Sequence, residues 1–125
     1  MTTQQILEAA RSAKGALALA SNAARNTALL GMADALCEAQ NQAAILAANA
    51  EDMAAAKGHI SDVMLDRLAL TKQRIEAMAQ GIRKVAALPD PVGKVLRRVE
   101  RPNGLVIEKT AVPMGVIAII YESRP

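Results

Sequence analysis

The chain has 125 residues and a mass of 13.1 kDa, which suits one ordinary domain or part of a larger protein and is too short for a complete two-domain enzyme. Hydrophobic residues make up 52% and charged residues 22%, as in globular rather than disordered proteins. The net charge of +3 is evenly spread, and one tyrosine is the only aromatic side chain apart from a single histidine. Without a basic cluster or aromatic rings for base stacking, no nucleic-acid partner is expected.

Neither a membrane nor an oxidising compartment is indicated. The N-terminus lacks a basic region followed by an apolar stretch, and no segment reaches the roughly 18 uninterrupted apolar residues of a membrane span. The single cysteine, Cys37, excludes an internal disulfide framework and fits a reducing environment. A cytoplasmic location is therefore predicted.

The composition changes near residue 89. Residues 1–88 contain 25 alanines and no proline, whereas residues 89–125 contain 6 valines and all 5 prolines. Alanine favours helices and valine favours strands, so we predict a helical part over 1–88 and a β part over 89–125.

Four helices and one short turn are predicted in the first part. Thr2 and Gln5 have the spacing of a capping box, and Gly58 is a plausible helix stop. Ser61 can cap the short turn, and Thr71 can cap the last helix. The predicted spans run from Thr2 or Thr3 to about Ala20, from Ser21 or Asn22 to a break near Asn41, from there to Gly58, from Ser61 through Leu68, and from Thr71 to Pro89. The inward face of the last helix is expected to carry Ile75, Met78, Ala79, Ile82 and Ala86.

A β-hairpin is predicted next, with strands from Val95 to about Glu100 and from Leu105 to about Val112, joined by a turn at 101–104 that contains Pro and Gly. The continuous apolar run from Met114 to Tyr121 is typical of a parallel strand covered on both faces. Such a strand needs neighbours, and only four residues follow it. This pattern predicts that the chain is part of a larger fold.

The candidate site lies in the last five residues, Tyr121, Glu122, Ser123, Arg124 and Pro125, which directly follow this strand. In open α/β folds ligands bind beyond the carboxyl ends of such strands, so these residues are predicted to contact a cofactor or phosphate. An ordinary exit from strand to loop explains the same pattern equally well.

Other chemistry-bearing residues have structural interpretations. His59 lacks the companions of a metal site, so no metal is expected, and Cys37 lies inside a predicted helix, where it is interpreted as a structural thiol. No glycine-rich phosphate loop is present.

Three motifs carry a family resemblance. The segment Val112–Pro125, with its sequence VPMGVIAIIYESRP, closely resembles the signature of the glutamate-5-semialdehyde dehydrogenases, also known as gamma-glutamyl phosphate reductases, of the aldehyde dehydrogenase superfamily. The resemblance extends to Met64–Thr71 and Leu88–Gly93, and more loosely to Ala47–Asp52. It therefore covers nearly the whole chain.

The resemblance implies an α+β fragment of an α/β aldehyde-dehydrogenase-like fold, in which N-terminal helices precede a hairpin and the first strand of a Rossmann-like sheet. It also implies NADPH-dependent reduction of gamma-glutamyl phosphate to glutamate 5-semialdehyde, a step of proline biosynthesis that releases phosphate. The family's catalytic cysteine lies beyond the position that matches Pro125, so no catalytic residue is assigned here and Cys37 is not equated with it. By analogy, the hairpin at 95–112 is expected to support self-association.

Two functions remain open at this point. The first is an inactive N-terminal part of the reductase, and the second is a stand-alone helical interaction module without catalysis. The module would be soluble and folded by itself, whereas an isolated part of the reductase would expose its apolar strand and tend to aggregate.

Overall fold

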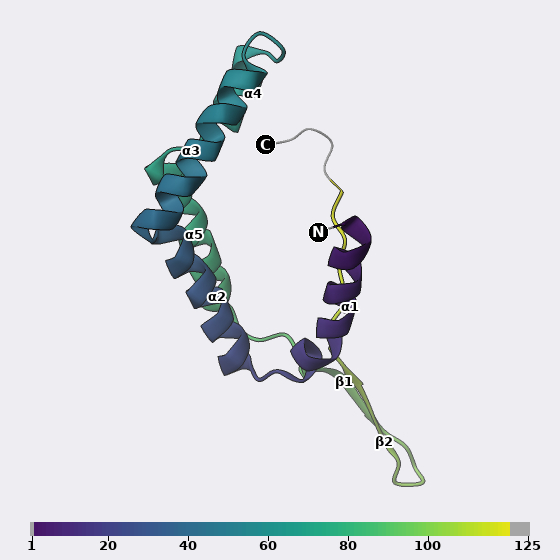
Figure 1. Ribbon diagram of the computed structural model, residues 1–125. Coiled ribbons are helices and arrows are strands. Elements are labelled where there is room, and N and C mark those ends of the chain that lie inside the picture. Colours follow the sequence, from purple (N-terminus) through teal and green to yellow (C-terminus); the bar gives the residue numbers. More distant parts are fainter. Residues whose placement is uncertain (1, 121–125) are drawn as a thin grey trace. The chain divides into compact units, whose positions relative to one another are not determined.

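A computed structural model describes residues 2–120 of the chain (Figure 1). These residues divide into two compact units, one formed by residues 2–22 with 88–119 and the other by residues 23–87 with Ile120. Over the described range five helices are followed by two strands, α1 to α5 and then β1 and β2. This order confirms the predicted fold class of helices followed by a hairpin.

The first unit begins with helix α1, Thr3–Leu19, and the predicted capping box is present. The Gln5 backbone N–H donates to Thr2 Oγ1 at 3.3 Å, and the Thr2 N–H donates to Gln5 Oε1 at 2.8 Å. No described residue of α1 is buried, and the apolar side chains of Ile6 and Leu17 are 52% and 62% exposed. The helix is therefore fixed by its cap and local hydrogen bonds more than by apolar packing within this chain.

The hairpin of this unit pairs β1, Val95–Glu100, with β2, Val106–Thr110, in antiparallel register. The predicted turn is confirmed: Gly104 has φ +82°, and its N–H donates to the Arg101 carbonyl oxygen at 2.9 Å. This left-handed φ is one that glycine adopts without steric cost.

The strand predicted from the apolar run that begins at Met114 is not formed over residues 114–120, the part of the run that the structure describes. Residues 112–120 have no strand hydrogen bonding, and β1 and β2 pair only with each other in a two-stranded sheet. A parallel strand obtains its ladder from neighbouring strands, so an apolar sequence alone is insufficient to form it. Ile117 and Ile119 are consequently 63% and 66% exposed.

Gly115 brings this segment against α1 inside the first unit. Its φ is +92°, and a Cβ at this position would lie 3.2 Å from Cε of Lys14. Both the backbone conformation and the close side chain therefore favour glycine here.

The second unit is helical throughout. Helix α4 starts after Ser61, whose Oγ accepts a hydrogen bond from the Met64 N–H at 3.4 Å, and α5 starts after Thr71, whose Oγ1 accepts from the Arg74 N–H at 3.1 Å. Both predicted caps are thus confirmed. The helices of this unit are α2 (Asn22–Cys37), α3 (Ala39–Ala56), α4 (Asp62–Leu68) and α5 (Lys72–Ala86).

The break between α2 and α3 falls at Glu38, three residues before the predicted position at Asn41. Asn41 lies inside α3, and its side-chain amide donates to the Ala35 carbonyl oxygen at 2.7 Å and to Glu38 Oε2 at 3.1 Å. The asparagine therefore acts from within the next helix to satisfy the end of the previous one. The break expected around Asn41 therefore lies three residues earlier, and Asn41 contributes to it through its side chain.

The core of this unit is small and aliphatic. Helices α3 and α5 lie side by side (Figure 1), and α5 contributes Ile75, Ala79 and Ala86 to the buried interior. The other two residues predicted to face inward are less buried than expected: Ile82 is half-buried, and Met78 is 44% exposed. The residues buried in this unit are completed by Ala33, Gln42 and Asn49.

Candidate functional site

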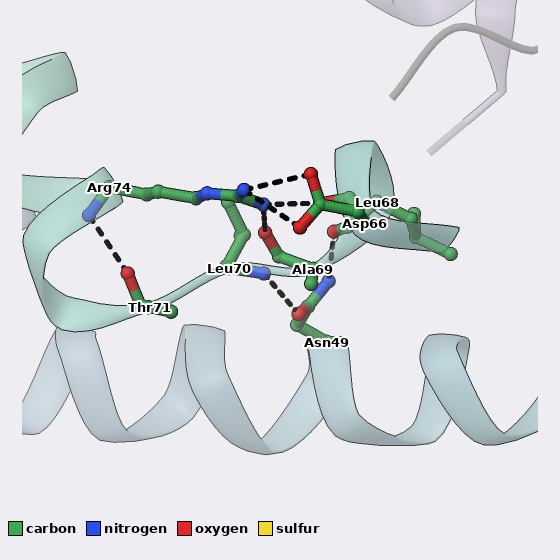
Figure 2. A network of polar contacts seen from close by, with 7 residues as sticks. All are labelled: Asn49, Asp66, Leu68, Ala69, Leu70, Thr71 and Arg74. Carbon is green, nitrogen blue, oxygen red and sulfur yellow. Dashed lines mark hydrogen bonds and ion pairs between the residues drawn. The ribbon is translucent and has the colours of Figure 1, made fainter. Parts of the chain in front are cut away.

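The segment predicted from sequence to contact a cofactor, Tyr121, Glu122, Ser123, Arg124 and Pro125, lies outside the described residues. A polar network of side chains and backbone groups lies elsewhere in the described residues (Figure 2). It is built around Met64–Thr71, the second motif that resembles the reductase family. This motif forms most of α4 and the connection that leads into α5.

Asn49 of α3 holds this connection through both ends of its side-chain amide (Figure 2). Its Nδ2 donates to the Leu68 carbonyl oxygen at 2.9 Å, and its Oδ1 accepts from the Leu70 N–H at 2.7 Å. Asn49 is only 9% exposed. One side chain thus satisfies two backbone groups at the end of α4, where the helix itself offers no partner.

Arg74 of α5 holds the same connection from its other side, as Figure 2 shows. Its Nη1 donates to the carbonyl oxygens of Asp66 and Ala69, the latter at 2.6 Å. Its Nη2 pairs with the Asp66 carboxylate at 3.1 Å. The planar guanidinium matches this set of acceptors in a way that a lysine ammonium would not.

These contacts assign the Asn49 and Arg74 side chains to positioning the connection between α4 and α5. Both groups donate to oxygens of the protein itself, and Arg74 is already neutralised by Asp66. A phosphate ligand would have to displace these internal partners. The motif Met64–Thr71 therefore serves the local structure in this chain.

A second polar contact links α2 to α5. Arg83 Nη2 donates to Asp34 Oδ1 at 2.7 Å, and the Arg83 side chain is 32% exposed. The hydrogen bond with Asp34, assisted by one with Cys37, raises the pKa of Arg83 above its ordinary value. The guanidinium is therefore a fixed positive charge beside the thiol, and it is already paired with a carboxylate.

Cys37 is half-buried at the last position of α2, with a free thiol. Its thiol is thus more exposed than the buried structural thiol expected from the sequence. His59 lies in the turn after α3, where its backbone N–H donates to the Ala56 carbonyl oxygen at 2.9 Å. Among residues 2–120, no group of three His, Cys, Asp or Glu side chains is placed to hold a metal ion.

Arg98 of β1 pairs with carboxylates of the hairpin. Arg98 forms an ion pair with Glu108 across the hairpin at 2.9 Å and with Glu100 at 3.5 Å. In the register Arg98 lies opposite Glu108. Cross-strand pairs of opposite charge help to fix the register of an antiparallel ladder.

Sequence reasoning missed the role of Asn49, although a signal was present. Asn49 lies three residues after Leu46 and four before Met53, so the helical spacing of the sequence places it on the same face as these two apolar residues. An asparagine within an apolar stripe indicates a buried amide with hydrogen-bond partners.

Among the described residues, none of the helices has both the length and the apolar character that a membrane span requires.

Comparison with known proteins gives a consistent result, although no family model matches the chain. A gamma-glutamyl phosphate reductase from Streptococcus pneumoniae (strain Hungary19A-6) is 58% identical over 125 residues, which is 100% of this chain and 29% of the relative. The same identity and coverage hold for the protein of that name from strain R6.

Two solved structures agree with this relationship. The gamma-glutamyl phosphate reductase of Thermotoga maritima matches with a TM-score of 0.77 and 33% identity, over 83% of this chain and 25% of that one. The Saccharomyces cerevisiae reductase matches with a TM-score of 0.77 and 41% identity, over 90% of this chain and 29% of that one. The resemblance predicted from three motifs is therefore confirmed: over its whole length this chain is similar to gamma-glutamyl phosphate reductases, of which it spans 29% in the Streptococcus relatives.

Proposed function

We propose that this chain is part of an enzyme that reduces gamma-glutamyl phosphate to glutamate 5-semialdehyde, with NADPH as the hydride donor and release of phosphate. The observation that carries the proposal is the 58% identity to gamma-glutamyl phosphate reductase over all 125 residues. Because the chain spans 29% of that relative, the activity is assigned to the whole enzyme rather than to these residues alone.

The described residues are proposed to support the fold of that enzyme. The reaction needs a nucleophile that displaces phosphate from the acyl carbon, followed by hydride transfer from NADPH to the resulting thioester. Cys37 is not proposed as this nucleophile, since it is half-buried at the end of α2 beside the Arg83–Asp34 pair. The nucleophile is therefore assigned to the part of the enzyme outside this chain.

The segment Tyr121–Pro125 remains our proposal for contact with NADPH. Its support is the motif resemblance and the general placement of ligands beyond strand ends in α/β folds. Replacing Arg124 with alanine in the intact enzyme is expected to raise the KM for NADPH more than it lowers kcat. Equal KM values for the two proteins would contradict this assignment.

The hairpin is proposed as a surface for self-association. Val95, Leu96, Val106 and Ile107 are between 42% and 57% exposed, which leaves apolar side chains on both strands without cover in this chain. Exposed strand edges with apolar side chains are common association surfaces. Replacing Leu96 and Ile107 together with lysine is expected to shift the oligomer towards smaller species in analytical ultracentrifugation.

The function is tested on the native gene product. An antibody against residues 3–60 captures it from its own cells. We place the reaction in the cytoplasm because Cys37 of this chain has a free thiol, as is usual in a reducing compartment. The intact mass is measured first, and the same sample is then assayed in reverse, by NADP+ reduction with glutamate semialdehyde and phosphate.

Turnover that requires phosphate and comes with a species well above 13.1 kDa is the expected result. Turnover without a phosphate requirement would indicate ordinary aldehyde oxidation and contradict the proposal. A folded, monodisperse 13.1 kDa species without turnover would instead favour the interaction module.

A further inference from the structure

The turn of the hairpin contains an asparagine followed directly by a glycine, Asn103 and Gly104. The sequence has four other asparagines, and none of them precedes a glycine. Both residues are exposed in the loop that joins β1 to β2. The side-chain amide and the peptide that follows it are therefore open to water.

The Asn103 side chain is folded back over this following peptide. Its Oδ1 accepts a hydrogen bond from the Leu105 N–H at 3.2 Å. A bond from an asparagine side chain to the N–H two residues on closes a ring that includes the side-chain carbon Cγ and the next backbone nitrogen, here that of Gly104. The Leu105 N–H also stabilises the negative charge that develops on Oδ1 when a nucleophile attacks Cγ.

The Gly104 nitrogen is the nucleophile that this arrangement offers. Glycine carries no Cβ beside the nitrogen, and the space that a Cβ would fill has no atom within 4 Å. The Gly104 N–H donates to the Arg101 carbonyl oxygen at 2.9 Å, so this bond must open before the nitrogen reacts. Because all the residues of the turn are exposed, water replaces the carbonyl when the turn opens locally.

We propose that Asn103 is a site of spontaneous covalent modification, in which its side-chain amide is converted to a carboxylate through a cyclic imide. The Gly104 nitrogen loses its proton to water and forms a bond to Cγ of Asn103. The bond between Cγ and the side-chain nitrogen breaks, and this nitrogen leaves as ammonia after taking up a proton. Water then opens the five-membered imide.

The bond that water breaks decides the product. Cleavage at the side-chain carbonyl leaves aspartate at position 103. Cleavage at the main-chain carbonyl leaves isoaspartate, in which the chain continues through the former side chain. In both cases one water is consumed and one ammonia is released, with no change of oxidation state.

The isoaspartyl product changes the turn that joins the strands. It adds one methylene group to the backbone between Arg101 and Leu105, which are linked by a hydrogen bond from the Arg101 N–H to the Leu105 carbonyl oxygen at 2.9 Å. Turn length and geometry set the register of a hairpin, so the longer backbone disturbs this end of the ladder. The site is independent of the proposed reductase activity.

The test uses the native gene product, captured as above and incubated at neutral pH. Samples taken over time are digested in acid, which halts the reaction, and electron-transfer fragmentation in the mass spectrometer distinguishes isoaspartate from aspartate. Asn22 is the internal control, since it is also exposed but is followed by Ala23. Conversion at Asn103 is expected to be at least about tenfold faster than at Asn22, with isoaspartate among the products. Equal rates would overturn the proposal, and aspartate as the sole product would show direct hydrolysis instead of the imide.

A variant and a second measurement test the two steps of the reasoning. Asn103→Gln retains the amide on an exposed side chain but requires a six-membered ring, so conversion is expected to fall at least about tenfold. Conversion at the original rate would contradict attack by the Gly104 nitrogen. In the isoaspartyl fraction, hydrogen exchange of the Leu105 amide is expected to speed up while that of Leu70 is unchanged. Unaltered exchange at Leu105 would refute the predicted change of the turn.

Discussion

The two hydrogen bonds of the Asn49 side chain, to the Leu68 carbonyl oxygen and from the Leu70 N–H, give the sharpest prediction about this chain. Asn49→Ala removes the acceptor for the Leu70 N–H and the donor for the Leu68 carbonyl, at 2.7 and 2.9 Å. Each orphaned buried backbone group costs about 1–3 kcal/mol. Because both groups are only part-buried, we take the lower end and expect a loss of about 2–3 kcal/mol in the free energy of unfolding. That is a large share of the stability of a small domain.

The assay is urea unfolding of the native gene product, followed by far-ultraviolet circular dichroism, together with hydrogen exchange of the Leu70 amide. The matched control is Gln40→Ala, which removes an exposed amide from the same helix, α3. Exchange at Leu70 is expected to speed up in Asn49→Ala and to stay unchanged in the control. The reasoning is refuted if the two variants unfold within about 0.5 kcal/mol of each other, the usual range for surface changes.

Asn49→Asp separates the two hydrogen bonds. The carboxylate retains an acceptor for the Leu70 N–H but places its second oxygen against the Leu68 carbonyl. Protonation restores a donor there, so the pKa of the new carboxyl is expected to be higher in the folded than in the unfolded chain. Its contribution to stability is then fully present below the unfolded pKa of about 3.9 and is lost as pH rises through the folded pKa. A stability difference from wild type that does not change with pH would contradict this account.

Four further variants test the other contacts. Arg74→Lys is expected to lower the free energy of unfolding by about 1 kcal/mol, because an ammonium cannot reach the two carbonyl oxygens and the carboxylate together. An unchanged free energy in urea unfolding would show that the planar geometry of the guanidinium is unimportant here. Thr71→Ala removes the N-cap of α5 and is expected to cost about 1 kcal/mol, with a matching loss of helical dichroism. Gly115→Ala places a methyl group at φ +92° and against the Lys14 side chain, so it is expected to lower the thermal unfolding temperature more than Gly104→Ala, whose Cβ meets open space. Equal decreases would show that the backbone angle φ alone causes the destabilisation. Arg83→Gln removes an exposed ion pair between α2 and α5, so its effect is expected at low salt and absent at high salt; an effect that persists at high salt would indicate packing instead.

The helix ends were the most predictable part of the fold. The capping box at Thr2, the caps at Ser61 and Thr71, and the stop at Gly58 were all located from sequence, because each depends on a side chain and a backbone only a few residues apart. The hairpin was equally local, since the turn chemistry sets where the two strands meet.

The missed features depend on contacts that are distant in sequence or absent from this chain. The α2–α3 break was expected near Asn41 and lies at Glu38, because the sequence does not show that this asparagine would reach back across the turn. The hydrogen bonds that hold the α4–α5 connection join Asn49 to Leu68 and Leu70, which lie 19 and 21 positions away in the sequence. The strand predicted from the apolar run that begins at Met114 has the right composition but no neighbouring strand to pair with among the described residues.

The sequence by itself determined the helices, their caps, the hairpin and, through three motifs, the relationship to gamma-glutamyl phosphate reductases. These features are encoded in short-range hydrogen bonding, in periodicity and in motif identity. Only the tertiary structure decided that Asn49 and Arg74 hold a connection instead of binding a ligand, and that Arg83 of α5 pairs with Asp34 of α2. Such partners of a side chain are decided when distant segments pack, and a linear pattern does not contain that information.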